Sequence, residues 1–267
     1  MMPDQKTPAQ HTAYWEKAEP PVRPSREMLR IYQDYLKSTD LWQRGDWGLL
    51  GCTAEIRSLA AQHQRPLCCI DIDPHIYEAT ACLCSPKPND TFLHNNWIHA
   101  DCSSSFDLII GDGSQSMLHP SEHNAFLANV HRMLRTKGHF FLRLQVHQPR
   151  HFHSTQEILD WYHEQPQQNS INQAIRSLLI IHWLDPATGT IDPKTFNENI
   201  DDLYQQKKLS DGEYQELCKK RMVFSLSYTT KEQFEQSIDS YFEVKDIQTP
   251  DDFYWAEHYP IYHLQKR

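Results

Sequence analysis

The feature that most constrains the fold is a series of short apolar runs between residues 45 and 146, each ending in a glycine or an acidic residue. Residues 47–50, 67–70 and 106–110 have the composition of buried strands, and Gly51, Asp71 and Gly111 follow them. Helices are predicted over 54–62, with Thr53 as N-cap, and over 121–135, before a further strand at 139–146. Such alternation predicts a doubly wound α/β fold with a parallel sheet.

The pattern changes after residue 146. The next eighty or so residues carry helix-start signals and few strand signals, with capping boxes at Ser154, Ser210 and Thr229 and an Asp192-Pro193 start, and we expect a helical insertion over 154–222. Apolar runs at 241–247 and 259–264 then predict a closing pair of strands, and a helix over 24–36 precedes the first strand. We expect one domain over 1–267, with a helical N-terminal lid over 1–44 and a helical cap over 150–225.

Charge and cysteine content narrow the possible partners. The net charge of −9 lacks the positive field that drives binding to nucleic acid. No apolar stretch approaches the roughly 18 residues of a membrane helix, and the polar N-terminus is unlike a signal peptide, so we expect no membrane association and a cytoplasmic location. Cys82 and Cys84 form a CxC pair without an obvious second pair, so we expect reduced thiols and no metal.

Polar residues at the predicted strand ends indicate a ligand site. Gly51 permits a tight turn, and the helix after Thr53 presents free N–H groups that suit an anionic group. Asp71, one strand further on, can accept hydrogen bonds from ribose hydroxyls, so an adenosine-type cofactor fits both positions. As alternatives, both residues are ordinary turn residues, or the chain is a nicotinamide-dependent oxidoreductase. The latter wants Gly-x-Gly-x-x-Gly, and this turn offers only Gly51.

Several motifs resemble those of the class I S-adenosylmethionine-dependent methyltransferases. Residues 50–55 read Leu-Gly-Cys-Thr-Ala-Glu and are similar to the Leu-Gly-x-Thr-x-Glu first motif of a bacterial subgroup. Residues 71–74, 96–97 and 107–114 resemble the family's acidic, adenine-side and fourth-strand motifs, and 134–143 its approach to strand five. The resemblance implies S-adenosylmethionine as cofactor and a seven-stranded, mostly parallel, Rossmann-like sheet with the helical insertion between strands five and six.

The resemblance also implies roles for individual residues. At the methionine end of the cofactor it places Gly51, Thr53 and Glu55. At the ribose and adenine it places Asp71, Ile72, Asn96 and Trp97. Around the sulfonium it places Asp112, Gly113 and Ser114. We further expect three residues of the lid to cover the cofactor: Tyr14, Trp15 and Arg23.

The acceptor side is less constrained. Methyl transfer depends mainly on positioning, but a histidine near the strand-four or strand-five loop could act as a base, and His119 and His147 are candidates; otherwise they are ordinary loop residues. Four aromatic residues could wall an apolar acceptor pocket or belong to the core: Trp161, Trp183, Tyr254 and Trp255. A cap over the sheet edge favours a small-molecule acceptor, whereas a helical hairpin pointing away would serve a homodimer interface. A non-catalytic, methyltransferase-like binding protein is the remaining alternative.

Overall fold

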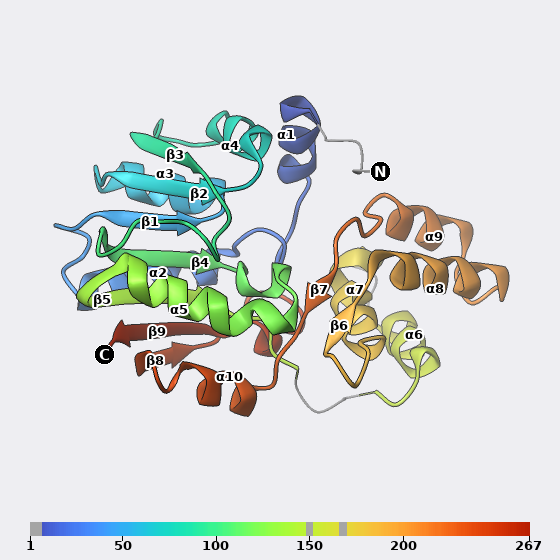
Figure 1. The fold of residues 1–267 in the computed structure, drawn as a ribbon. Coiled ribbons are helices and arrows are strands. Elements are labelled where there is room, and N and C mark those ends of the chain that lie inside the picture. The colour runs from blue at the N-terminus through green and yellow to red at the C-terminus, as the bar shows by residue number, and fades with distance from the viewer. Residues whose placement is uncertain (1–6, 148–151, 166–169) are drawn as a thin grey trace.

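A seven-stranded sheet forms the centre of the protein in the computed structural model, which describes residues 7–147, 152–165 and 170–267. The strands lie in the order β3-β2-β1-β4-β5-β9-β8, and β1 to β5 run parallel. Their bounds are Trp47–Leu50 (β1), Leu67–Asp71 (β2), Asp90–His94 (β3), Phe106–Asp112 (β4), Leu134–Arg143 (β5), Phe242–Gln248 (β8) and Ile261–Lys266 (β9). β9 inserts antiparallel between β5 and β8. The predicted mostly parallel, doubly wound fold is confirmed (Figure 1).

Helices cover both faces of the sheet. α2 (Arg26–Ser38), α3 (Ala54–Gln62) and α4 (Pro74–Ala81) pack on one face, and α5 (His123–Met133) and α10 (Lys231–Ile238) pack on the other. From Leu108 on, the side chains of β4 alternate accordingly: Leu108 and Ile110 join the first apolar cluster, and Ile109 joins the second. Phe106 also joins the second cluster, because the register shifts between Phe106 and Leu108. A sheet buried on both faces explains the uninterrupted apolar runs in the sequence.

The helical insertion after β5 forms a separate lobe beyond one end of the sheet (Figure 1). It contains α6 (Thr155–Glu164), α7 (Ile171–His182), α8 (Pro193–Gln205), α9 (Asp211–Cys218) and a short ladder of β6 (Thr190–Ile191) and β7 (Leu226–Ser227). Its helices bury an apolar cluster of their own. The chain leaves the sheet domain at Val146 and returns beside it at Thr229, where the two backbones pair.

Two predicted boundaries need correction, and one strand was missed. β5 begins at Leu134 rather than residue 139, because the chain pairs with β4 on both sides of an irregularity between Phe106 and Leu108. The α10 capping box starts at Thr230, whose Oγ1 accepts from the backbone N–H of Gln233 at 3.1 Å. The backbone of Thr229 instead pairs with the segment that enters the lobe. β3 was not among the predicted strands.

The N-terminal part adds α1 (Pro8–Glu16), which packs against α4 and buries no residue of its own. Its Thr12 hydroxyl donates to the carbonyl of Ala79 at 3.2 Å. Within the described ranges, no helix combines the length and the apolar character that crossing a membrane requires.

Candidate functional site

The carboxyl ends of β1 and β2 converge around Gly51. This residue has φ of +110°, a left-handed conformation that favours glycine, and its N–H donates to the carbonyl of Ile70 at 2.9 Å. A Cβ atom there would stand 3.9 Å from Asp71 Oδ2 and 4.0 Å from Trp97 Cζ2. The structure therefore brings together the residues predicted for the methionine, ribose and adenine sides.

Asp71 is held rigidly at the end of β2. Its Oδ1 accepts from the N–H of Asp73 at 3.0 Å, and Asp73 in turn caps α4 by accepting from His75 N–H at 2.9 Å. Burial raises the pKa of the Asp71 carboxyl to about 6. Ile72 follows with 65% of its surface exposed, an unusual fraction for a large apolar side chain at a strand end.

Asn96 and Trp97 lie in the loop after β3, and internal hydrogen bonds fix both. Asn96 Oδ1 accepts from the N–H of Ile98 at 2.9 Å, and the indole N–H of Trp97 donates to the Ile70 carbonyl at 2.6 Å. Asn129 of α5 donates to the carbonyl of Trp97 at 2.7 Å. Trp97 therefore presents its ring toward Gly51 in a fixed position.

Asp112 forms a buried ion pair with Arg143. The Arg143 Nε lies 2.6 Å from Asp112 Oδ1, and the two side chains are 3% and 1% exposed. Tyr32 donates to the same oxygen at 3.0 Å, and Arg143 Nη1 donates to the carbonyl of Pro21 at 2.6 Å. Thr53, at the predicted N-cap position, makes no capping hydrogen bond, and its hydroxyl faces Asp112 Oδ2 at 3.5 Å. Asp112 therefore ties together β4, β5, α2 and the start of α3.

Sequence reasoning missed Arg143 as a partner of this carboxylate. The signal was present, because Asp112 and Arg143 end neighbouring parallel strands and face each other in the register. In the loop that follows, Gly113 has φ of +77° and the buried Ser114 hydroxyl has no hydrogen-bond partner among the described residues. A Cβ atom at Gly111 would stand 2.5 Å from this buried oxygen and 3.1 Å from Phe140 and Leu142, so the role of Ser114 at the sulfonium stays a prediction.

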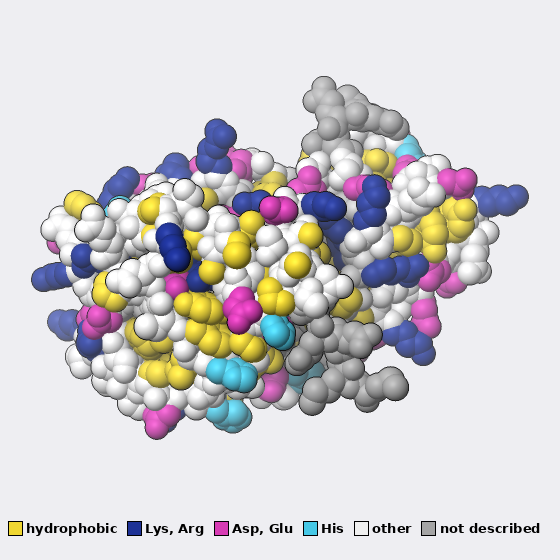
Figure 2. All heavy atoms as spheres, turned by 90° about the horizontal axis from the view of Figure 1, so that it is seen from above, with side chains coloured by type: hydrophobic (Ala, Val, Ile, Leu, Met, Phe, Trp, Pro, Cys, Tyr) yellow, Lys and Arg dark blue, Asp and Glu magenta, His cyan; other side chains and the backbone are white. Residues whose placement is uncertain are grey.

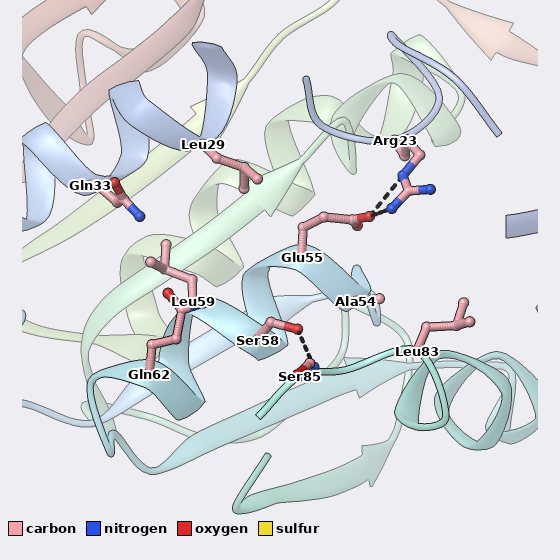
Figure 3. A pocket seen from close by; sticks show the side chains of 10 residues that line it. All are labelled: Arg23, Leu29, Gln33, Ala54, Glu55, Ser58, Leu59, Gln62, Leu83 and Ser85. Atoms are coloured by element: carbon pink, nitrogen blue, oxygen red, sulfur yellow. Dashed lines mark hydrogen bonds and ion pairs between the residues drawn. The ribbon is translucent and has the colours of Figure 1, made fainter. Parts of the chain in front are cut away.

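Two lid residues converge on Glu55 in the first turn of α3. Arg23 Nε donates to Glu55 Oε1 at 2.8 Å, and the Trp15 indole N–H donates to Oε2 at 3.3 Å. A pocket of about 250 Å³ lies beside this contact, between α2, α3 and the loop after α4, and Arg23 and Glu55 line it (Figure 3). Since Arg23 already balances the carboxylate, the role of Glu55 toward an ammonium group stays a prediction.

The residues at this edge fit an adenosine cofactor. Asp71 offers a buried carboxylate oxygen facing the side-chain-free Gly51, which suits ribose hydroxyls. Ile72 and Trp97 offer apolar surface for a purine ring. No group of three metal-ligating side chains is found among the described residues.

The histidines singled out from the sequence lie in the loop after β4 and in the segment that enters the lobe. His119 is exposed, and its Nδ1 lies 2.7 Å from the Ser121 hydroxyl at the start of the short helix η2 (Pro120–Glu122). His147 donates its backbone N–H to the Thr229 carbonyl at 2.8 Å, where the chain enters the lobe. Their role as bases stays a prediction.

A different histidine, His123, bridges the loop after β4 and the lobe. Its ring nitrogens lie 3.3 Å from Gln115 Nε2 and 3.1 Å from the Ser227 hydroxyl of β7. Burial lowers the pKa of His123, so its ring is neutral at pH 7. Nothing in the spacing distinguished it among the sixteen histidines of the chain.

The four aromatic residues predicted as a pocket wall separate into two groups. Trp161, Tyr254 and Trp255 meet edge to face, with ring centroids of Trp161 and Trp255 5.0 Å apart. Trp183 instead packs on Phe196 within the lobe, at 5.6 Å between centroids, and serves its core. The wall prediction therefore applies to the first group only.

Comparisons with known proteins bear on the fold. No family model and no curated protein matches the sequence. A solved methyltransferase of Methanosarcina mazei, described as S-adenosylmethionine-dependent, is 16% identical with a TM-score of 0.52, over 88% of this chain and 96% of the other. The N-methyltransferase NodS of Bradyrhizobium japonicum, solved with S-adenosylhomocysteine, is 11% identical with a TM-score of 0.51, over 98% and 99% of the two chains.

A third structure, from Rhodobacter sphaeroides and described as a putative zinc-dependent alcohol dehydrogenase, is 13% identical with a TM-score of 0.61, over 98% and 100% of the chains. At these identities the likeness concerns the fold alone. The chain has the Rossmann-like fold that S-adenosylmethionine-dependent methyltransferases share.

Proposed function

We propose that the protein transfers a methyl group from S-adenosylmethionine to a small-molecule acceptor. The observation that carries the proposal is the convergence of Gly51, Asp71 and Trp97 at the carboxyl edge of the sheet, beside the Asp112–Arg143 pair. Ligands of open α/β sheets bind at this edge. The shared fold supports the choice of cofactor, because relatives in fold such as NodS were solved with its demethylated product.

The cofactor would supply a methyl group made electrophilic by its sulfonium. Asp71 would accept hydrogen bonds from the ribose hydroxyls, and Ile72 and Trp97 would contact the adenine. Because Arg143 neutralises Asp112 internally, this carboxylate would fix the geometry of the loop that carries Ser114 rather than act as a base. Holding the acceptor in line can supply much of the rate acceleration.

The position of the lobe supports a small acceptor. The Tyr259 hydroxyl, just before β9, donates to Ser177 of α7 at 3.1 Å, and Trp255 donates to the Ala174 carbonyl at 2.7 Å. These contacts seat α7 against the carboxyl edge of the sheet, and a site covered by the lobe in this way would suit a small molecule. Over the face shown in Figure 2, Lys and Arg side chains lie singly among acidic and neutral ones, which disfavours a nucleic-acid substrate.

Calorimetric titration with S-adenosylmethionine, S-adenosylhomocysteine and NADH tests the proposal. We expect the first two to bind and NADH not to bind. The Asp71→Ala variant should lose roughly tenfold to a hundredfold in affinity, the worth of hydrogen bonds to a charged group. Asp246→Ala, on the exposed edge strand β8, should bind as the wild type does.

Each other outcome has a distinct meaning. Binding of NADH alone would favour an oxidoreductase, and binding of the product without methyl transfer to any acceptor would favour a binding protein. If the folded Asp71→Ala variant keeps full affinity, the assignment of Asp71 to the ribose is wrong.

A further inference from the structure

Arg176 of α7 is a cation without a balancing anion. Within the part of the chain that the structure describes, its buried Nη1 atom has no hydrogen-bond partner, and no acidic side chain forms an ion pair with it. Its guanidinium carbon lies 4.7 Å from the centre of the Phe196 ring. The two fully buried arginines, Arg57 and Arg143, each lie 2.6 Å from an aspartate. A buried guanidinium donor left without an acceptor is costly, and an acceptor group of a ligand would offset this cost.

The polar neighbours of Arg176 do not supply the missing charge. The groups that interact electrostatically with Arg176 are three tyrosine hydroxyls, those of Tyr14, Tyr228 and Tyr259. Burial raises the pKa of each of these hydroxyls, so all three are neutral at pH 7. Burial also lowers the pKa of Arg176 to about 10, which still leaves it charged at pH 7.

This charge lies on the side of the lobe that faces the sheet edge. Tyr259 precedes β9, whose Ile261 pairs with Arg143 at the end of β5. The Tyr228 hydroxyl lies 3.2 Å from that of Tyr259, and both tyrosines interact electrostatically with Arg143 as well as being neighbours of Arg176. The tyrosine pair thus separates the paired Arg143 from the unpaired Arg176.

We propose that Arg176 binds a carboxylate of the methyl acceptor and so sets the substrate class of the site. The inference rests on the proposed function and names the chemistry of its second substrate. The guanidinium fork matches a carboxylate with two parallel hydrogen bonds. One uncompensated cation balances one carboxylate, whereas a phosphate dianion would need a second cation and the nearby Arg143 is already paired with Asp112.

The test uses pairs of small probes that differ in charge: benzoate with benzamide, phenylacetate with phenylacetamide, and hexanoate with hexanamide. Each pair and inorganic phosphate are titrated into the wild type with and without saturating S-adenosylhomocysteine. We expect at least one carboxylate to bind about tenfold or more tightly than its amide. Arg176→Met, which keeps an unbranched apolar stem and removes the guanidinium, should lose this preference.

Arg221→Met is the matched control, because Arg221 is an arginine of the same lobe paired with Asp201 on the surface. It should keep the preference for the carboxylate. If Arg176→Met does not fold, Arg176→Gln takes its place. A purely structural role of Arg176 would change thermal stability without changing discrimination between acid and amide.

The proposal is overturned if the wild type prefers no carboxylate over its amide, if the preference survives removal of Arg176, or if phosphate binds more tightly than every carboxylate. Failure of the proposed function has a separate signature, because S-adenosylhomocysteine would then not bind the wild type. The carboxylate preference measured without it would still report on Arg176.

Discussion

At the scale of single residues, the raised pKa of Asp71 predicts pH-dependent cofactor binding. The carboxyl titrates near pH 6 in the ligand-free protein because it is buried. Ribose hydroxyls donate most strongly to the ionised form, so affinity for S-adenosylhomocysteine should fall as the pH drops below 6, by up to about tenfold per pH unit. Calorimetry between pH 5 and 8 measures this, and Asp71→Asn should remove most of the dependence. If the affinity does not change between pH 7 and pH 5, the assignment of Asp71 to the ribose is contradicted.

The raised pKa of Asp71 has the opposite effect on the stability of the ligand-free fold, which it increases at low pH. A raised carboxyl pKa means that the folded state holds the proton more tightly than the unfolded state, whose pKa is about 3.9. The stabilisation from this group is therefore complete below pH 4 and is lost as the pH rises to about 6. Burial of this charge is thus a cost to the ligand-free fold above pH 6, which is typical of a site kept for binding.

Individual residues also show where sequence reasoning stopped. Gly51 and Asp71 could be placed because strand ends in a parallel sheet share an edge. Predicting the Asp112–Arg143 pair requires the order of the strands in the sheet, and the local sequence pattern does not contain that order. The missing partner of Arg176 could not be predicted at all, because it depends on how α7 packs against residues more than fifty positions away in the sequence.

At the scale of elements, α1 is predicted to contribute more to cofactor binding than to stability. It buries no residue, yet its Trp15 donates a hydrogen bond to Glu55 and its His11 lies 3.5 Å from Asp73, which is close in sequence to Asp71, the residue proposed to bind the ribose. Deleting residues 1–17 leaves the Pro21 carbonyl that Arg143 needs. We expect affinity for S-adenosylhomocysteine to fall about threefold to tenfold, while Tm of the ligand-free protein falls by less than about 4 °C.

Calorimetry and thermal unfolding of the deletion variant give both numbers. Trp15→Phe is the matched control for the Glu55 contact, because it keeps an aromatic ring and removes the hydrogen bond. A large loss of Tm with unchanged affinity would mean that α1 serves packing and is not a lid over the cofactor.

Element boundaries were predictable where a side chain marks them and not where tertiary pairing decides. Ser154, Asp192 and Ser210 cap their helices as predicted, since a cap is a local hydrogen bond. The start of β5 at Leu134 was missed because its pairing with β4 continues across an irregular register, and no local sequence pattern marks such an irregularity.

At the scale of the whole molecule, the protein consists of two packed units joined at one edge. The sheet domain buries two apolar clusters, one on each face, and the lobe buries a third. The two chain segments that connect them lie side by side at Val146 and Thr229, and His123 adds a polar contact to Ser227. A core divided in this way allows the units to open independently.

This division predicts a local response to the cofactor product in hydrogen exchange followed by mass spectrometry. A ligand bound only at the sheet edge slows hydrogen exchange wherever exchange requires an opening of the structure that disrupts the ligand site. Exchange through openings that leave the site intact is unchanged. S-adenosylhomocysteine should therefore slow exchange about tenfold or more in residues 47–62 and 67–74, and leave 193–218 of the lobe unaffected. The Asp71→Ala variant, at the same ligand concentration, should lose most of this protection.

Adding a carboxylate probe should slow exchange in residues 171–182, which carry Arg176 and face the sheet edge. If S-adenosylhomocysteine alone protects 193–218 equally, the lobe and the sheet open as one unit. The acceptor could not then enter through an opening of the lobe while S-adenosylhomocysteine stays bound to the sheet.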